Sequence, residues 1–281
     1  MPARRRAVRP PSAVPDPLQR LRSGFSAFRE SQFDSGALGY RLLAVEGQRP
    51  EILLIGCSDS RVDPAVLTGS GAGDLFVVRN IAALVPPYGN EARLKGTSSA
   101  VEFAVRALEV RHVVVLGHAL CGGVRALAAG REETDGRFEF IADWMEIAGD
   151  ARRAVAAALA DKPEPERLRA LEQATTLASL RNLLGFPWIA ERVAAGALAL
   201  HAWYFDLIDG NLWAYDPRER AFRMADGRPS GIDGPCPPVD IDDFARRAGA
   251  YRCRKTGGPY ACRCDAEADL ERVTPAGALP F

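Results

Sequence analysis

The chain has 281 residues, 47% of them hydrophobic, which is enough to bury one sizeable core. Lysine and arginine together number 36, as do aspartate and glutamate, so the formal net charge is zero and no overall basic field is available to hold nucleic acid. No stretch reaches the roughly 20 apolar residues that a membrane-spanning helix needs. We therefore expect a globular protein that binds neither nucleic acid nor a membrane.

The N-terminal residues 1–16 are rich in arginine and proline and lack the apolar run of a secretion signal. We expect them to form a disordered extension of a cytoplasmic protein. Residues 17–46 follow with leucine and phenylalanine at helical spacing and a glycine-bearing break at 35–39. This pattern predicts an N-terminal helical arm made of two helices, each with one apolar face.

Three short apolar runs come next, at residues 51–57, 74–80 and 112–118. Each run ends in polar residues, and this pattern is typical of buried strands in a parallel sheet. Between the second and third runs, residues 95–109 carry apolar side chains on one helical face, among them Phe103. The order strand, helix, strand is the βαβ pattern of an α/β fold.

The second half of the chain predicts two helices and a hairpin. Residues 140–160 and 164–184 are rich in alanine, leucine and arginine and are separated by prolines. The apolar run 197–208 then meets 211–216 across an Asp-Gly pair, which is a strong hairpin signal. We expect an α/β domain over 17–225 with a mostly parallel sheet, an antiparallel edge strand and flanking helices.

The C-terminal residues 226–281 are rich in glycine, proline, arginine and cysteine. We interpret them as a tail with little periodicity and expect one short helix at 240–248. The four tail cysteines lack the paired CxxC spacing of common zinc ribbons, so a second zinc site is the less favoured interpretation. These cysteines are Cys236, Cys253, Cys262 and Cys264.

Two clusters of metal-binding residues follow predicted strands. Cys57 and Asp59 come after the first strand, and His118 and Cys121 come after the third. In an open parallel sheet, ligands bind beyond the carboxyl ends of the strands, so we expect the clusters to meet. Two thiolates, an imidazole and a carboxylate suit tetrahedral zinc. Either cysteine alone would more often be a buried small hydrophobe, but the four residues together indicate a metal site.

Arg61 decides whether that site is structural or catalytic. A zinc ion bound by all four residues has no position left for water, so no chemistry follows. Arg61 can hold the Asp59 carboxylate in a bidentate fork and so free the fourth position. The alternative is an ordinary loop salt bridge, which for exposed pairs contributes only about 0 to 1 kcal/mol.

The motifs resemble those of the beta-class carbonic anhydrases. CSDSRV at 57–62 and GHALCGG at 117–123 are similar to the two metal motifs of that family, and FVVRNIA at 76–82 to the segment between them. SLRNLLGFPW and GALALHAWYFDLIDGNL, at 179–188 and 196–212, resemble its later helices and edge strands. The similarity extends from Leu21 to Asp216.

The resemblance implies one zinc ion per chain, held by Cys57, His118 and Cys121, with Asp59 alternately binding zinc and pairing with Arg61. It implies reversible hydration of CO₂ to bicarbonate and a proton through zinc-bound hydroxide. Two thiolates weaken the ion as a Lewis acid, so we expect activity to rise into alkaline pH.

The resemblance also places Gln48, Phe76, Ile81, Phe103 and Gly122 in the substrate pocket, partly across a dimer interface. It implies a homodimer or a dimer of dimers in which the N-terminal helices embrace a second subunit. For the three apolar residues, a plain core role is the alternative. His112 and His201 lie in apolar strands and are expected to be structural.

Two other functions stay open. One is a non-catalytic zinc protein whose closed site serves stability or regulation, which an assay of CO₂ hydration across pH would identify. The other is the same fold acting on CS₂, which a comparison of rates on the two substrates would reveal.

Overall fold

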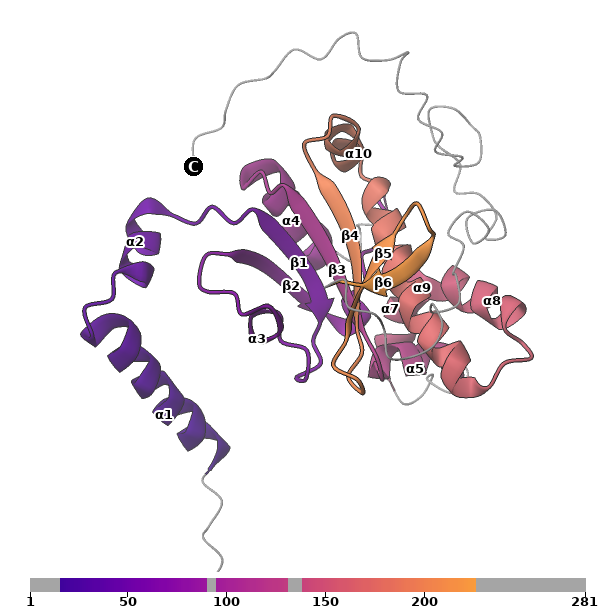
Figure 1. Cartoon of the computed structure of the whole chain (residues 1–281), viewed down its shortest axis with the longest axis horizontal. Helices are drawn as coiled ribbons and strands as arrows, with labels where there is room; N and C mark the ends of the chain where they lie inside the picture. The colour runs from indigo at the N-terminus through magenta and orange to yellow at the C-terminus, as the bar shows by residue number, and fades with distance from the viewer. Residues whose placement is uncertain (1–15, 90–94, 131–137, 226–281) are drawn as a thin grey trace, which may run out of the picture. The chain divides into compact units, whose positions relative to one another are not determined.

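The computed structural model describes residues 16–89, 95–130 and 138–225 (Figure 1). The chain divides into two units, Met1–Gln48 and Arg49–Phe281. The tail cysteines and the expected helix at 240–248 lie outside the described residues, and the domain boundaries expected from composition stay a prediction. Within the described part of the chain, no helix is both long and apolar enough to cross a membrane.

The first unit contains the two helices that the sequence predicts. Helix α1 (Pro17–Arg29) starts with a proline and with Asp16, whose carboxylate accepts the N–H of Leu18 at 3.3 Å. It runs into a π-helical turn, η1 (Glu30–Asp34), and α2 (Gly39–Glu46) follows. No residue of these three elements is buried, and the apolar side chains that remain exposed include Leu18, Leu21, Phe25, Leu42 and Val45.

The second unit is built on a six-stranded sheet in the order β2-β1-β3-β4-β5-β6. The first four strands in this order are parallel, and β5 and β6 are antiparallel to their neighbours. The strand bounds are Leu75–Asn80 (β2), Ile52–Cys57 (β1), His112–His118 (β3), Ala199–Phe205 (β4), Leu212–Asp216 (β5) and Ala221–Met224 (β6). The predicted α/β fold with an antiparallel edge is confirmed. The run at 74–80 was predicted as a buried strand, but β2 lies at the other edge of the sheet and has no buried residue.

Strand β6 is not predicted from the sequence. This strand has only four residues, too few for an alternating pattern to stand out, but Phe222 is buried against the rings of Tyr204 and Tyr215. The antiparallel edge therefore contains two strands, and β5 lies inside the sheet rather than at its edge.

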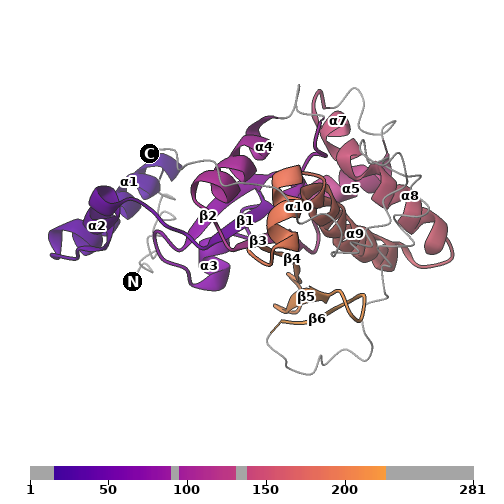
Figure 2. The same ribbon diagram turned by 90° about the horizontal axis from the view of Figure 1, so that it is seen from above.

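Helices cover the two faces of the sheet unequally. On one face, α4 (Lys95–Glu102), the π-helical turn η3 (Phe103–Ala107) and α10 (Pro187–Ala194) pack on the valines of β3. The central α9 (Glu164–Leu184) packs on the same face against β3 and β4. On the other face lies the short α3 (Pro64–Thr68), and Figure 2 shows α4 and α3 on opposite sides of β1 and β2.

Beside the sheet, a second core joins α5 (Gly122–Ala129) to α7 (Ile141–Met145), α8 (Gly149–Ala158) and α9. The single helix expected at 140–160 is broken by a 3₁₀ turn, η4 (Glu146–Ala148), and α8 begins directly after it at Gly149. The helix expected at 95–109 ends in the π turn η3, and its buried face is not the predicted one. Val101, Ala104 and Val105 are buried there, while Phe103 is 47% exposed.

Candidate metal centre

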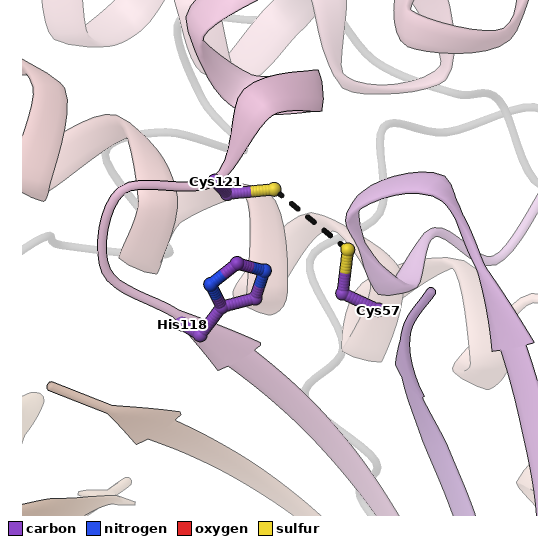
Figure 3. A group of neighbouring side chains, drawn as sticks. All are labelled: Cys57, His118 and Cys121. Atoms are coloured by element: carbon purple, nitrogen blue, oxygen red, sulfur yellow. Dashed lines mark hydrogen bonds between the residues drawn. The ribbon is translucent and has the colours of Figure 1, made fainter. Parts of the chain in front are cut away.

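The sheet brings the two predicted metal motifs together. β1 and β3 are parallel neighbours, so Cys57 at the end of β1 and His118 at the end of β3 lie at the same edge of the sheet. Cys121 follows His118 as the N-cap of α5. The ligand atoms of Cys57, His118 and Cys121 all lie within 4.8 Å of one another, and the two sulfurs are 4.0 Å apart (Figure 3). All three side chains are buried.

The His118 ring is oriented as a metal ligand should be. Its Nδ1 lies 2.8 Å from the carbonyl oxygen of Ala119, so Nδ1 carries the proton and donates it to that carbonyl. The other nitrogen, Nε2, then keeps its lone pair, and this buried atom has no hydrogen-bond partner among the described residues. A buried acceptor left without a partner is unfavourable, and a metal ion would satisfy it. The donor set therefore fits zinc.

The contact between the two sulfurs favours a thiolate at Cys57 and a thiol at Cys121. The hydrogen bond with Cys121 is the main cause that lowers the pKa of Cys57 to about 4, and the same contact raises the pKa of Cys121. The N–H groups of Gly123 and Val124, at the start of α5, act against that rise. A cation held between the sulfurs would lower both pKa values, because it stabilises negative charge on each.

Two glycines allow the close packing behind the ligands. A Cβ on Gly123 would lie 2.6 Å from Cγ2 of Ile81 and 3.2 Å from Cβ of Ala82. A Cβ on Gly117 would lie 2.1 Å from Oγ1 of Thr176 on α9. Neither position has room for a side chain, and this brings η2 (Ile81–Ala83) and α9 against the ligand segment.

Asp59 is bound to Arg61. The guanidinium donates from Nε to Oδ1 at 2.9 Å and from Nη2 to Oδ2 at 2.6 Å, which is the bidentate fork expected from the sequence. Chiefly through this contact, Arg61 holds the pKa of the Asp59 carboxyl far below its usual range. Nη2 of Arg61 also donates to the carbonyl oxygen of Leu120 at 3.2 Å. The carboxylate of Asp59 is not part of the Cys57, His118 and Cys121 group.

Arg79, a residue not predicted to have a role, fixes the loop that carries Cys57 and Asp59. Its guanidinium donates to the carbonyl oxygens of Cys57 at 2.9 Å and Asp59 at 2.7 Å, and it pairs with Asp63 at 2.8 Å. An arginine inside the apolar run of β2 is the signal that could have marked it.

Glu172 and Tyr204 were also missed, and they support the other ligand segment. Oε1 of Glu172 accepts the N–H of Cys121 at 3.1 Å, and Oε2 accepts the hydroxyl of Tyr204 at 2.8 Å. Burial raises the pKa of both groups, most strongly that of Tyr204. A charged residue in the most buried stretch of α9 could have been noticed, but its partner on β4 could not.

The expected substrate residues lie in two different units. Phe76 is half-buried and its ring centroid is 5.8 Å from that of Phe103, while Ile81 is partly exposed in η2. A Cβ on Gly122 would meet no atom within 4 Å. Gln48 is exposed at the end of the first unit. Whether these residues contact substrate stays a prediction.

Comparisons with known proteins identify relatives of most of the α/β part. The model of the carbonic anhydrase family matches residues 52–212. The chain is 38% identical over 194 residues to the chloroplastic beta carbonic anhydrase 5 of Arabidopsis thaliana, a match that spans 69% of this chain and 63% of the relative.

Two solved structures are also similar. The beta-carbonic anhydrase CcaA shares 35% identity and a TM-score of 0.71 over 74% of this chain and 100% of that chain. A tetrameric beta-carbonic anhydrase of Sordaria macrospora shares 32% identity and a TM-score of 0.57 over 70% of this chain and 92% of that chain.

Proposed function

This chain belongs to the beta-class carbonic anhydrase family, and we propose that it catalyses the reversible hydration of CO₂ to bicarbonate and a proton. The observation that carries the proposal is the buried group of Cys57, His118 and Cys121, which has the composition of the zinc site of that family. Zinc supplies a Lewis acid that lowers the pKa of water, so that a nucleophile is available near neutral pH.

We infer that Asp59 and Arg61 act as a gate. While the guanidinium of Arg61 holds both carboxylate oxygens, Asp59 cannot use them as metal ligands, and the fourth position of the site is left to water. Asp59 then acts as a hydrogen-bond acceptor that orients the nucleophile. Because its pKa lies far below the usual range, the carboxylate stays ionised and can accept that bond throughout the neutral and alkaline range.

The apolar residues Phe76, Ile81 and Phe103 are proposed to hold CO₂, which has no net dipole and is poorly suited to a charged pocket. Gly122, whose Cα faces open space, leaves room beside Cys121. Gln48 is proposed to donate a hydrogen bond to a substrate oxygen.

We propose that the working protein is a homodimer or a dimer of dimers. The first unit exposes leucine, phenylalanine and valine side chains on helices without a buried residue, and apolar surface of this kind is stabilised when a partner covers it. A related protein of Sordaria macrospora is described as tetrameric. Sedimentation of the full chain tests the proposal, and a monomer at micromolar concentration would reject it.

We also propose a cytoplasmic location, because Cys57 and Cys121 are free cysteines, and metal-binding thiols stay reduced in the cytosol. The Arabidopsis relative is described as chloroplastic, so imaging of a C-terminal fluorescent fusion in the source cell is the appropriate test.

The deciding experiment is stopped-flow CO₂ hydration by the full chain, together with zinc quantification. We expect one zinc ion per chain and a rate well above the uncatalysed rate. A zinc-loaded chain without activity would favour the closed structural site. For the gate, Arg61→Ala should keep its zinc and lose most activity, whereas full activity would reject the gate. Arg153→Ala, which removes an ion pair with Asp150 on α8, is the matched control and should behave like the unaltered chain.

A further inference from the structure

We propose that the buried carboxylate of Glu172, held by the hydroxyl of Tyr204, is the positioning group that sets the zinc ligand Cys121. This inference rests on the metal centre of the proposed function, but it concerns how the protein builds that centre rather than the reaction. It assigns a role to two groups that neither bind the metal nor belong to the gate.

Both carboxylate oxygens of Glu172 accept a hydrogen bond. Oε1 accepts the main-chain N–H of Cys121 at 3.1 Å, and Oε2 accepts the hydroxyl of Tyr204 at 2.8 Å. Glu172 is 4% exposed and Tyr204 is 1% exposed, so water cannot readily replace either bond. One carboxylate therefore links α9 and β4 to the main chain of a metal ligand.

The position of Glu172 is itself tightly set. Thr176, one turn further along α9, fills the space left by Gly117, and its hydroxyl donates to the main-chain oxygen of Glu172 at 3.1 Å. This close approach of α9 to β3 puts Glu172 beside the segment that follows His118. Tyr204 is the register partner of Gly117 in the neighbouring strand, so its hydroxyl reaches the same carboxylate.

The ligand segment needs such an anchor. Leu120, between His118 and Cys121, has φ 58°, a left-handed conformation that a leucine adopts only when its surroundings enforce it. The carbonyl oxygen of Leu120 accepts from Arg61, and the next N–H, that of Cys121, donates to Glu172. The peptide between Leu120 and Cys121 is thus held at both its polar atoms, and its orientation fixes where the Cys121 sulfur points.

An ionisable side chain in this place is otherwise unexpected. Its neighbours on α9 include Ala170, Leu171 and Ala174, which belong to the apolar core between α5, α8 and α9. Burial of a carboxyl group among such residues is unfavourable unless its hydrogen bonds are made. The competing explanation is that Glu172 only joins α9 to β4. In that case, its replacement should leave the zinc affinity unchanged.

The test is the zinc affinity of the full chain, measured by competition with a chromophoric chelator and without substrate. Glu172→Met removes both acceptor atoms at similar length, Glu172→Gln keeps Oε1 as an acceptor, and Tyr204→Phe removes only the hydroxyl. Thr175→Val is the control, because it removes a buried hydrogen bond to Leu171 on the same helix without touching a ligand.

Loss of groups that orient metal ligands commonly weakens metal binding by about 10- to 100-fold. We expect Glu172→Met to raise the zinc Kd by about 10-fold or more. The Kd of Glu172→Gln should stay closer to that of the unaltered chain, and the Kd of Tyr204→Phe should lie between those of the two Glu172 variants. With Co²⁺ in place of zinc, the sulfur-to-metal absorption band should shift in Glu172→Met and Tyr204→Phe but not in Thr175→Val.

A zinc Kd within about twofold of the unaltered chain in Tyr204→Phe and Glu172→Met would overturn the proposal, as would an equal loss of affinity in Thr175→Val. If Glu172→Met does not fold, Tyr204→Phe decides alone. Because no rate enters the measurement, the result is independent of whether the chain hydrates CO₂.

Discussion

Gly122 and Gly123 stand side by side at the start of α5, yet an added methyl group should have different effects at the two positions. At Gly123 the new Cβ would lie 2.6 Å from Cγ2 of Ile81 and 3.2 Å from Cβ of Ala82, whereas at Gly122 it would meet no atom within 4 Å. Overpacking of this kind costs about 1–3 kcal/mol. Alanine is favoured over glycine in a helix by about 1 kcal/mol at either position, so this contribution cancels when the two variants are compared.

We therefore expect Gly123→Ala to unfold with a free energy about 1–3 kcal/mol lower than that of Gly122→Ala. Urea unfolding of both zinc-loaded variants measures this difference, with the slope of the transition checked for equality. Because Cys121 directly precedes these glycines, the strain should also reach the metal, so Gly123→Ala should bind zinc more weakly. Equal midpoints for the two variants, or a less stable Gly122→Ala, would refute the reasoning.

Three further outcomes are expected. Arg192→Ala should lower the free energy of unfolding by about 2–3 kcal/mol, because the guanidinium donates to carbonyl oxygens of the turn after η3, including that of Val110 at 3.2 Å. Urea unfolding measures it, and Arg192→Lys should recover only part of the loss, since one ammonium group cannot reach several carbonyls. For pH, burial and then the nearby His112 lower the pKa of His201, so the unfolded chain takes up this proton at a higher pH than the folded chain. The stability contribution is thus present above the ordinary histidine pKa and is lost as pH falls below it. His201→Gln should make unfolding less sensitive to pH between about pH 7 and about pH 5, and an unchanged slope would contradict this. Removal of zinc by a strong chelator should lower the unfolding temperature, and re-addition of zinc should restore it, because the ion binds the folded chain. A calorimetric scan that does not respond to the chelator would show that these ligands do not hold the ion.

The sequence predicted the parts of the fold and site that depend on local pattern. The apolar runs at β1, β2 and β3 begin and end within one residue of the predicted bounds, since each run is flanked by polar residues. Cys57 and Cys121 could be paired because the carboxyl ends of neighbouring parallel strands must meet. Phe103 was placed on the wrong face because its ring is apolar, but Val101, Ala104 and Val105 form the buried face at ordinary helical spacing, and that spacing leaves Phe103 outside it.

The groups that escaped the sequence analysis depend on contacts between distant segments. Glu172 lies 51 residues after Cys121, and Tyr204 lies 32 residues after Glu172. Their meeting depends on the order of β3 and β4 in the sheet and on the close packing of α9 at Gly117. No local motif in the sequence predicts the strand order or the packing of α9 at Gly117. Arg79 was readable as a charge inside a buried strand, but its three acceptors lie on the Cys57 loop and could not be assigned.

Arg61 connects the two halves of the centre. Its Nη2 atom donates both to the Asp59 carboxylate on the loop after β1 and to the carbonyl oxygen of Leu120 on the segment after β3. Arg79 holds the first segment from the side of β2, and Glu172 holds the second from α9. If Asp59 leaves the fork to bind the metal, the guanidinium of Arg61 loses its hydrogen bonds to that carboxylate. Its remaining hydrogen bond to the carbonyl oxygen of Leu120 should then weaken. We therefore expect the proposed gate, if it operates, to be coupled to the peptide between Leu120 and Cys121, because a single guanidinium contacts both segments.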